Sequence, residues 1–441
     1  MSRPPERVPQ VSVDPWEGGA PWPWLPPSST DEPVKFPLPP TLSLRRGWTL
    51  AALVTLLMSI SFLDRQALSA LAPTVTEALG LSNAQYGLLG AAFALAYLLG
   101  APVAGYMLDR FGARRGLVVS LVAWSAASAA HTLVTGFGQL LALRVALGLT
   151  EAPSFPGAAQ IIQRALPDGR SRMRAVGLLF TGSSLGAFAA PFLANAFAGA
   201  YGWRSAFVGT SLVGLAWLPI WLVVSGGRAR AVLDTPVGPK AAVAGTRSIW
   251  SYSGVWRSFV ATFALAPVVG FSVLWLAKFL AFAHGLNTQQ AAFYLAPPAL
   301  CFDLGAVLFG YVASRSPRTA RACFSLASTL AALMGGLSFM TSPVTVSALC
   351  CVSLVGVGGA LAVVTGQLIA SIPSKLVSSG MAIGGAAAQS LALIIAMPLI
   401  GFSVDRTGSY VPALLSIAAS ALFGAGLWLG WRNEGLPRAK A

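Results

Sequence analysis

Charged side chains are scarce in this sequence. They make up only 10% of its 441 residues, whereas hydrophobic residues make up 55%. A soluble domain carries roughly 25% charged residues, so the composition excludes a water-soluble globular protein. The chain is instead expected to lie in a lipid bilayer.

Histidine and cysteine, the residues that most often hold metals or act in catalysis, are also few: the sequence has 2 histidines and 4 cysteines. His131 and His284 fall near predicted loops, which favours positions at the membrane interface over roles in proton relay. The cysteines lack the spacing of metal ligands and are expected to be packing residues; they are Cys301, Cys323, Cys350 and Cys351. The sequence also lacks a P-loop and a zinc motif. It therefore predicts no enzyme, no cofactor and no metal.

Long apolar runs recur along the chain. Each is close to the roughly 20 residues that a helix needs to cross a bilayer. The runs do not alternate between apolar and polar residues as the strands of a membrane β-barrel do. The sequence therefore predicts an all-α membrane protein with twelve transmembrane helices, at about residues 48–75, 84–108, 116–135, 138–164, 175–200, 204–225, 256–284, 289–313, 320–340, 343–370, 377–402 and 410–431.

The net charge of +15 follows the predicted loops. Basic residues such as Arg45, Arg114 and Arg170 gather in segments on one side of the membrane. Only Arg204 and Arg406 fall in segments on the other side. Because basic loops stay in the cytoplasm, we expect a multi-pass protein of the inner (cytoplasmic) membrane with both termini cytoplasmic. Membrane topology thus accounts for the excess of basic residues, and no nucleic-acid partner is expected.

A polar and basic stretch after Ser225 divides the predicted helices into six and six. The first residues are rich in proline and lack the basic start and apolar core of a signal peptide, which is typical of a disordered tail with polyproline character. The expected organisation is a disordered cytoplasmic tail (1–44), an N-terminal six-helix bundle (45–225), a cytoplasmic linker (226–255), a C-terminal six-helix bundle (256–432) and a second cytoplasmic tail (433–441).

The two predicted bundles resemble each other. GYMLDRFGARR starts at Gly105 after the second predicted helix, and GYVASRSPRTAR starts at Gly310 after the eighth. This repeat indicates that one six-helix unit is used twice. The second copy carries Ser314 where the first has an acid, which predicts a weaker gate on that side.

GYMLDRFGARR resembles the signature loop of the major facilitator superfamily. The resemblance implies two six-helix halves that rock around a central site. We expect Gly105 to permit close approach of two helices and Asp109 to face the positive end of a neighbouring helix. The residues expected to form this gating loop are Gly105, Asp109, Arg110, Gly112 and Arg114.

Further segments resemble the anion:cation symporter branch of that superfamily, which holds the galactonate, glucarate and hexuronate carriers. These segments are SFLDRQALSALAP, RVALGLTEAPSFPG, YGWRSAF and PLIGFSVDRTGSY, together with Tyr97. The paired asparagines that follow EAPSFP in the galactonate and glucarate carriers are replaced here by Ala158 and Ala159. In that branch, the Asp-Arg pair of the first helix and the Arg and Glu of the fourth serve in anion binding and proton coupling. The matching residues here are Asp64, Arg65, Arg144 and Glu151.

Six ionisable residues lie well inside the predicted helices: Asp64, Arg65, Arg144, Glu151, Lys278 and Asp303. Because a charge at mid-membrane costs roughly 2.5–3.5 kcal/mol, such residues are expected to face a cavity or each other. A guanidinium matches a carboxylate with two parallel hydrogen bonds, so we expect Arg65 to bind a substrate carboxylate. Arg144 is expected to be a second cationic contact or the partner of a carboxylate.

A proton that travels with an anion cancels its charge against the membrane potential. Its carrier must be an acid whose surroundings change between conformations. Glu151 is the first candidate for this role and Asp64 the second. The alternative is a static salt-bridge network that holds the N-terminal half together. Pro153 and Pro156 remove amide donors just after Glu151, which predicts a bend in the fourth helix.

In the C-terminal half, Lys278 either pairs with Asp303 or binds a second carboxylate. Phe271, Trp275 and Phe282 are spaced to share one helix face, where one or two rings stack on the substrate or pack between helices. Side chains that bind hydroxyl groups are few. The full set expected to contact the substrate is Arg65, Tyr97, Arg144, Gln160, Trp275, Lys278, Gln367, Gln389 and Ser390.

The sequence thus predicts a monomeric secondary active transporter that imports a small organic anion, a sugar acid such as a hexonate or hexuronate, together with protons. Sodium coupling is left open. Three alternatives remain: a carrier of aromatic carboxylates or dicarboxylates, a drug:proton exporter and a non-transporting membrane sensor. Exporters usually carry a GPxxGG-like signature in the fifth helix, and GSSLGAFAAP, which starts at Gly182, lacks its Gly-Pro pair.

Overall fold

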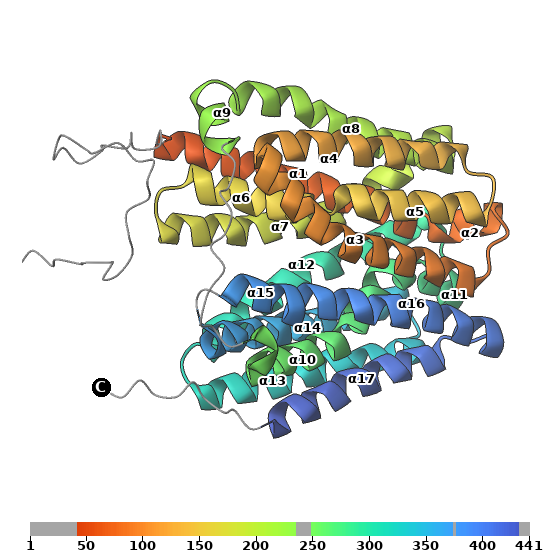
Figure 1. Ribbon diagram of the computed structural model, residues 1–441. Helices are drawn as coiled ribbons and strands as arrows, with labels where there is room; N and C mark the ends of the chain where they lie inside the picture. Colours follow the sequence, from red (N-terminus) through yellow and green to blue (C-terminus); the bar gives the residue numbers. More distant parts are fainter. Residues whose placement is uncertain (1–41, 235–247, 374–375, 432–441) are drawn as a thin grey trace, which may run out of the picture. The chain divides into compact units, whose positions relative to one another are not determined.

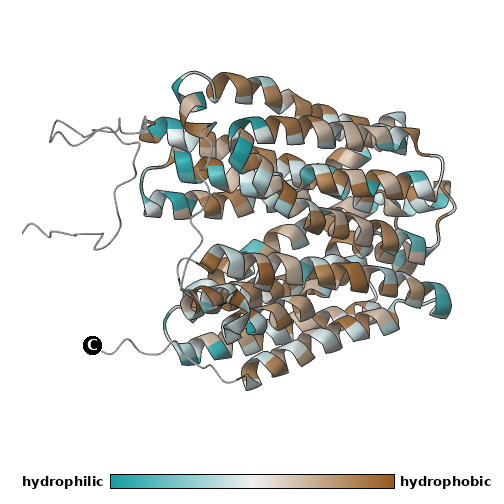
Figure 2. Ribbon diagram, viewed as in Figure 1, coloured by the Kyte–Doolittle hydropathy of each residue, from teal (hydrophilic) through white to brown (hydrophobic). Residues whose placement is uncertain are grey.

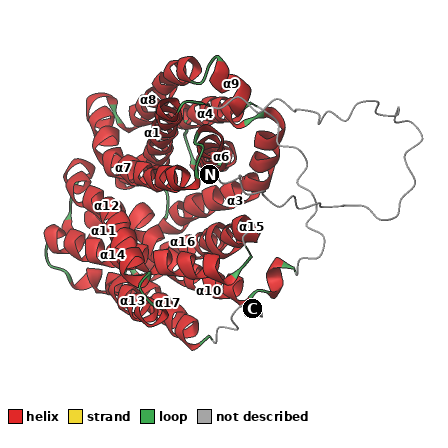
Figure 3. Ribbon diagram, turned by 90° about the vertical axis from the view of Figure 1, so that its left-hand side faces the viewer, coloured by secondary structure: helices red, strands yellow, loops and turns green. Residues whose placement is uncertain are grey.

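The computed structural model describes residues 42–234, 248–373 and 376–431, all of them within one compact unit, Pro40–Ala441. These residues form helices and no strands (Figure 3). Nearly all of the predicted tail 1–44, the tail 433–441 and the middle of the predicted linker lie outside the described residues.

The helices that precede the linker follow the predicted spans closely (Figure 1). They are α1 (Leu44–Ala70), α2 (Ala72–Ala78), α3 (Asn83–Phe111), α4 (Ala113–Ala130), the short 3-10 helix η1 (His131–Leu133), α5 (Phe137–Glu151), α6 (Ser154–Ala165), α7 (Gly169–Tyr201), α8 (Trp203–Val224) and the short α9 (Arg228–Leu233).

The helices after the linker form the second predicted set. They are η2 (Ile249–Ser251), α10 (Ser253–Gly270), the π-helix η3 (Phe271–Trp275), α11 (Leu276–His284), α12 (Thr288–Ala313), α13 (Pro317–Ala332), η4 (Leu333–Phe339), α14 (Pro343–Ser371), α15 (Val377–Met381), the π-helix η6 (Ala382–Ala387), α16 (Ala388–Thr407) and α17 (Val411–Gly430).

Eleven helical segments of the described chain are long and apolar enough to cross a membrane. The predicted fourth helix is divided into α5 and α6, of 15 and 12 residues, which are each too short to cross alone. The division falls at Ala152 and Pro153, because Pro153 and Pro156 have no amide hydrogen to continue the ladder of hydrogen bonds. The predicted all-α membrane fold is confirmed, and its fourth crossing is a broken helix.

The helices run between two ends of the described structure, which we call the linker end and the distal end (Figure 1). At the linker end, α1 begins, α9 lies and α15 begins. At the distal end lie α2, η1 and the turns before α12 and α17. Hydrophilic residues gather at these ends, whereas the lengths of the helices are mostly hydrophobic (Figure 2).

The starts of α3 and α12, the second helix of each set, are built alike. At α3, Ser82 accepts a hydrogen bond from the amide of Gln85 at 3.1 Å, and the Gln85 side chain accepts one from the amide of Ser82 at 3.0 Å. At α12, Asn287 and Gln290 form the same capping box. The structural repeat therefore accompanies the repeat in sequence.

The hydrophobic core is shared between the two sets of helices at the distal end. There, Leu68 and Tyr86 belong to the same cluster of buried residues as Trp275 and Met397. At the linker end the clusters are separate. One contains residues of the first set, such as Leu50 and Leu117, and another contains Val255, Leu368 and Ile372 of the second set.

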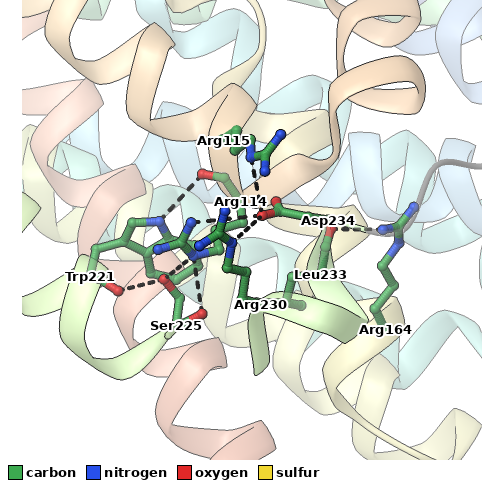
Figure 4. Close-up of polar contacts among 8 residues, drawn as sticks. All are labelled: Arg114, Arg115, Arg164, Trp221, Ser225, Arg230, Leu233 and Asp234. Atoms are coloured by element: carbon green, nitrogen blue, oxygen red, sulfur yellow. Dashed lines mark hydrogen bonds and ion pairs between the residues drawn. The ribbon is translucent and has the colours of Figure 1, made fainter. Parts of the chain in front are cut away.

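The first residues of the linker are fixed to the start of α4 and the end of α6 (Figure 4). Arg114 donates to the carbonyl of Ser225 at 3.0 Å and lies 3.7 Å from the carboxylate of Asp234. Arg164 donates to the carbonyl of Leu233 at 2.7 Å. Gly112 has φ +85°, and a Cβ there would lie 2.5 Å from the Cα of Asp234. This position therefore requires glycine.

The expectation that Gly105 lies at a close helix crossing is wrong. A Cβ at Gly105 would meet no atom of the described chain within 4 Å. The close contacts between α3 and α16 lie nearer the distal end, where Gly87 packs against the backbone of Met397 and Gly401 against that of Asn83. The sequence pattern identifies the loop, but it does not show which surface of α3 faces another helix.

Candidate functional site

Arg65 of α1 and Glu151 of α5 form an ion pair between the helices. Nη2 of Arg65 lies 2.7 Å from Oε1 of Glu151, and Nε lies 3.2 Å from the same oxygen. The hydroxyl of Ser61, one helical turn before Arg65, also donates to Oε1. Glu151 is fully buried, and its Oε2 has no hydrogen-bond partner among the described residues. One oxygen of this carboxylate thus receives every donor, and the other oxygen is left to accept a proton or a further donor.

Arg144 lies two turns before Glu151 on α5 and is only 2% exposed. Its Nε and Nη1 groups have no hydrogen-bond partner in the described part of the chain. The Arg144 guanidinium lies 5.0 Å from the centroid of the Phe93 ring of α3. A buried cation with unused N–H groups is the feature that an incoming carboxylate requires.

Aromatic rings surround the Arg65 guanidinium. It lies 4.6 Å from the ring centroid of Phe62, 4.9 Å from that of Phe93 and 5.2 Å from that of Tyr97. Phe93 and Tyr97 are four residues apart on α3 and stack with their centroids 6.0 Å apart. These rings hold the cation in place electrostatically and keep its charge away from lipid.

Asp64 points away from Arg65, as expected for adjacent residues on a helix. It is 1% exposed, and its Oδ1 accepts a hydrogen bond from Ser128 of α4 at 3.5 Å. Trp124 and Thr210 also lie beside this carboxylate. Asp64 is therefore enclosed by α4 and α8, separate from the Arg65–Glu151 pair.

A predicted substrate contact, Gln160, and a residue of the predicted gating loop, Asp109, lie in contact nearer the linker end. Gln160 of α6 donates from Nε2 to the carboxylate of Asp109 at 3.0 Å. Asp109 was expected to face the end of a neighbouring helix, and Gln160 to face the substrate. The hydrogen bond instead joins α3 to α6, so this glutamine is occupied in the present conformation.

Lys278 and Asp303 do not pair in this structure. The ammonium of Lys278 lies 5.1 Å from the ring centroid of Tyr86 and 6.0 Å from that of Trp275, at the distal end. Asp303 of α12 lies beside Ser184 of α7. The two ionisable groups of the C-terminal half therefore face different parts of the N-terminal half.

The aromatic residues expected to share one face meet around Tyr410, the last residue of the segment PLIGFSVDRTGSY. The centroids of Phe271, Trp275 and Phe282 lie 6.2, 6.2 and 5.4 Å from that of Tyr410. The first two are fully buried, whereas Phe282 is 60% exposed. This cluster packs helices together at the distal end, away from the Arg65–Glu151 pair.

The remaining predicted contacts lie on other helices. Gln367 of α14 lines a small pocket near the linker end, together with Arg257 and Ser371. Gln389 and Ser390 are half-buried near the start of α16. Of the predicted substrate and coupling residues, the structure thus brings together Arg65, Tyr97, Arg144 and Glu151.

Ser61, Phe62 and Phe93 are not among the predicted site residues, although Ser61 and Phe62 begin the segment SFLDRQALSALAP. The spacing of Phe93 and Tyr97 by four residues was the available signal, because it places both rings on one face of α3. Ser61 carried a similar signal, since it precedes Arg65 by one turn.

Residues 54–396 match the profile of the Major Facilitator Superfamily. The chain is 30% identical over 279 residues to the galacturonate transporter of Dickeya chrysanthemi, a match that covers 60% of this chain and 81% of the relative. It is 30% identical over 284 residues to the hexuronate transporter of Escherichia coli (strain K12), where 60% of this chain spans 64% of the relative. The D-galactonate transporter of Escherichia coli O6:H1 is 27% identical over 418 residues, which cover 86% of this chain and 94% of the relative.

A similar solved structure is that of a bacterial homolog of the human lysosomal transporter Spinster, in an inward-facing and unoccupied conformation. Its TM-score is 0.69 at 21% sequence identity, and the match covers 88% of this chain and 97% of that chain. At this identity the likeness shows the fold alone.

Proposed function

We propose that this chain, which belongs to the Major Facilitator Superfamily, is a secondary active transporter for a sugar acid such as a hexonate or hexuronate. It is a transporter and not an enzyme. The relatives named for galacturonate, hexuronate and D-galactonate transport support this substrate class. The halves at 45–225 and 256–432 rock around the site, so that it opens to one side of the membrane at a time.

The main structural support for an anionic substrate is Arg144, which is buried and has N–H groups without hydrogen-bond partners among the described residues. An isolated guanidinium in a low-dielectric interior is unfavourable, and a ligand carboxylate compensates it with charge-assisted hydrogen bonds. Arg144 is therefore the first cation that a substrate meets in this conformation. Arg65, held by Glu151, becomes the second when that pair opens.

Glu151 couples the proton to the substrate in this proposal. A proton that binds Glu151 neutralises the carboxylate, so its attraction for Arg65 falls and the guanidinium is free to bind substrate. Loss of the substrate restores the Arg65–Glu151 pair and expels the proton. The anion and the proton thus move together. Asp64, enclosed by α4 and α8, is the second candidate for the coupling site.

The linker end faces the cytoplasm of the cell in this proposal. Arg45, Arg114 and Arg164 lie there, whereas Arg204 lies at the distal end, and basic loops stay in the cytoplasm. Because the two halves share a core at the distal end, we propose that the site opens toward the cytoplasm in this conformation. The protein acts as a monomer in the inner membrane and needs no cofactor.

The test is uptake by the purified protein in liposomes with an imposed proton gradient. Hexuronates, hexonates, aromatic carboxylates and dicarboxylates are compared at equal concentration, and the coupling ion is identified by exchanging the proton gradient for a sodium gradient. We expect gradient-driven accumulation of a hexuronate or hexonate. The aromatic wall of Phe62, Phe93 and Tyr97 favours an aromatic carboxylate as the second candidate. Failure of every acid to accumulate would refute the proposed function.

A further inference from the structure

Asp405, near the end of α16, binds the first residues of α3 across the boundary between the two halves. Its Oδ1 accepts a hydrogen bond from the amide of Asn83 at 3.0 Å and another from the Asn83 side chain at 2.8 Å. Its Oδ2 accepts the amide of Ala84 at 2.7 Å. One carboxylate thus joins the C-terminal half to the N-terminal half at the distal end.

These bonds complete the hydrogen bonding at the start of α3. The first amides of a helix have no acceptor within it, and the start of a helix carries partial positive charge. Ser82 and Gln85 satisfy each other in the capping box. Asn83 and Ala84 lie between them, and the acceptor for their amides comes from the other half. A negative carboxylate is the side chain best suited to this position.

Close packing brings Asp405 to this place. Gly401 lies one turn before Asp405, and a Cβ there would overlap the backbone of Asn83. Next to it, the hydroxyl of Tyr86 donates to the carbonyl of Leu274 at 2.8 Å, again across the two halves. Asp405 is therefore the charged member of a closed contact surface at the distal end.

At the linker end, α3 and the segment that leads into α16 are not closely packed at two glycines. A Cβ at Gly105 of α3 or at Gly385, just before α16, would meet no atom of the described chain within 4 Å. The sequence around Asp405, GFSVDRTG, repeats the spacing of GYMLDRFG around Asp109. Yet Asp109 bonds to Gln160 within its own half, whereas Asp405 reaches the other half. Among the described residues, the distal copy of this pattern bonds across the two halves and the copy around Asp109 does not.

We propose that Asp405 is a positioning residue for transport, which latches the distal side closed and must release α3 before that side opens. The inference rests on the proposed function, because a latch between halves acts only if the halves move. Its bonds form when the distal side closes and break when it opens. Removing the carboxylate therefore shifts the population toward the conformation that is open at the distal end.

The test measures how far the distal side is open. The full-length protein carries Ser69→Cys as its only cysteine, in oriented vesicles with the distal side outward. Ser69 is 5% exposed, lies at the distal end of α1 and is beside Tyr86. We expect Asp405→Ala to raise the rate of labelling by a membrane-impermeant thiol reagent about fivefold, the effect of losing one ordinary helix cap. Asp405→Asn, which keeps one acceptor oxygen, should raise it less.

Asp168 provides the matched control. Its carboxylate accepts the amide of Ser171 at 2.8 Å and so caps α7, but within the same half. Asp168→Ala should lower thermal stability and leave the labelling rate unchanged. Where Asp405→Ala fails to fold, Asn83→Ala takes its place, because it removes only the side-chain bond and must still raise labelling.

Transport kinetics separate a latch from a purely structural contact. In Asp405→Ala we expect the maximal rate of uptake to fall and the apparent KM for external substrate to fall as well, because more molecules expose the site outward. An unchanged labelling rate in folded Asp405→Ala would overturn the latch, as would an equal increase in Asp168→Ala. Absence of uptake by the parent protein would count against the proposed function instead, and the labelling result would still decide whether the latch exists.

Discussion

Arg65 and Arg144 lie against the same aromatic ring, with their guanidinium carbons 4.9 and 5.0 Å from the centroid of Phe93, but only Arg65 has a carboxylate partner. The two cations are therefore unequal in this conformation. Arg65 is occupied by Glu151, whereas Arg144 presents unused N–H groups.

Arg144→Gln should weaken substrate binding by roughly tenfold to a hundredfold, the worth of about 1.5–3 kcal/mol for hydrogen bonds to a charged group. The measurement is the ligand-induced rise in melting temperature, which depends on the dissociation constant. Arg204→Gln is the matched control, because Arg204 also lies on an aromatic ring, 4.2 Å from the centroid of Trp203, but at the distal surface. Equal affinity in Arg144→Gln and the parent protein would remove Arg144 from the site.

Glu151→Gln should abolish accumulation of substrate against a gradient and leave exchange of substrate across the membrane. The amide keeps the shape of the carboxylate but cannot take up a proton, so exchange should also lose its dependence on pH. Counterflow and gradient-driven uptake are measured in the same liposomes. Glu77→Gln, at an exposed position of α2, should behave as the parent. Accumulation that survives in Glu151→Gln would move the coupling role to Asp64.

Arg65→Ala should lower the free energy of unfolding by about 3–5 kcal/mol, because it leaves the buried Glu151 charge without its partner. The double variant Arg65→Ala with Glu151→Gln should recover most of this stability, since no charge is then left unpaired. It should still fail to transport. Thermal unfolding of the single and double variants measures the recovery. A double variant as unstable as Arg65→Ala would show that the ion pair is not the reason for the loss.

Gly112→Ala should destabilise the protein by about 1–3 kcal/mol, because φ +85° with ψ 147° is a backbone conformation that essentially only glycine adopts. The added methyl group would also collide with Asp234 and loosen the start of the linker. Thermal unfolding measures the loss. Gly105→Ala, in the same loop signature, should cause no loss because open space surrounds it and alanine favours the helix. A similar loss in both variants would contradict this difference between the two glycines.

Much of the fold could be predicted because the patterns that determine it are local. Apolar runs of bilayer length locate the helices, and prolines after Glu151 locate the break between α5 and α6. The opposite directions of Asp64 and Arg65 follow from helix geometry alone. These features depend on residues close together in the chain.

The contacts of the site could not be predicted to the same degree, because they depend on which helices lie side by side. The sequence proposes Arg65 and Glu151 as functional residues but does not show that they bind each other. It also does not show the π-helix η3, whose extra residue per turn changes the direction of every aromatic side chain that follows. Asp405 carries a recognisable motif, yet its acceptor role depends on a residue more than three hundred positions away.

The core shared at the distal end also affects how the protein is made. Leu68 and Tyr86 enter the membrane early in synthesis, but Trp275 and Met397, which belong to the same cluster, follow much later. The first six crossings therefore cannot finish packing while they are alone. They wait, partly assembled, until the ribosome has delivered the rest, and lipid tails cover these apolar side chains in the meantime.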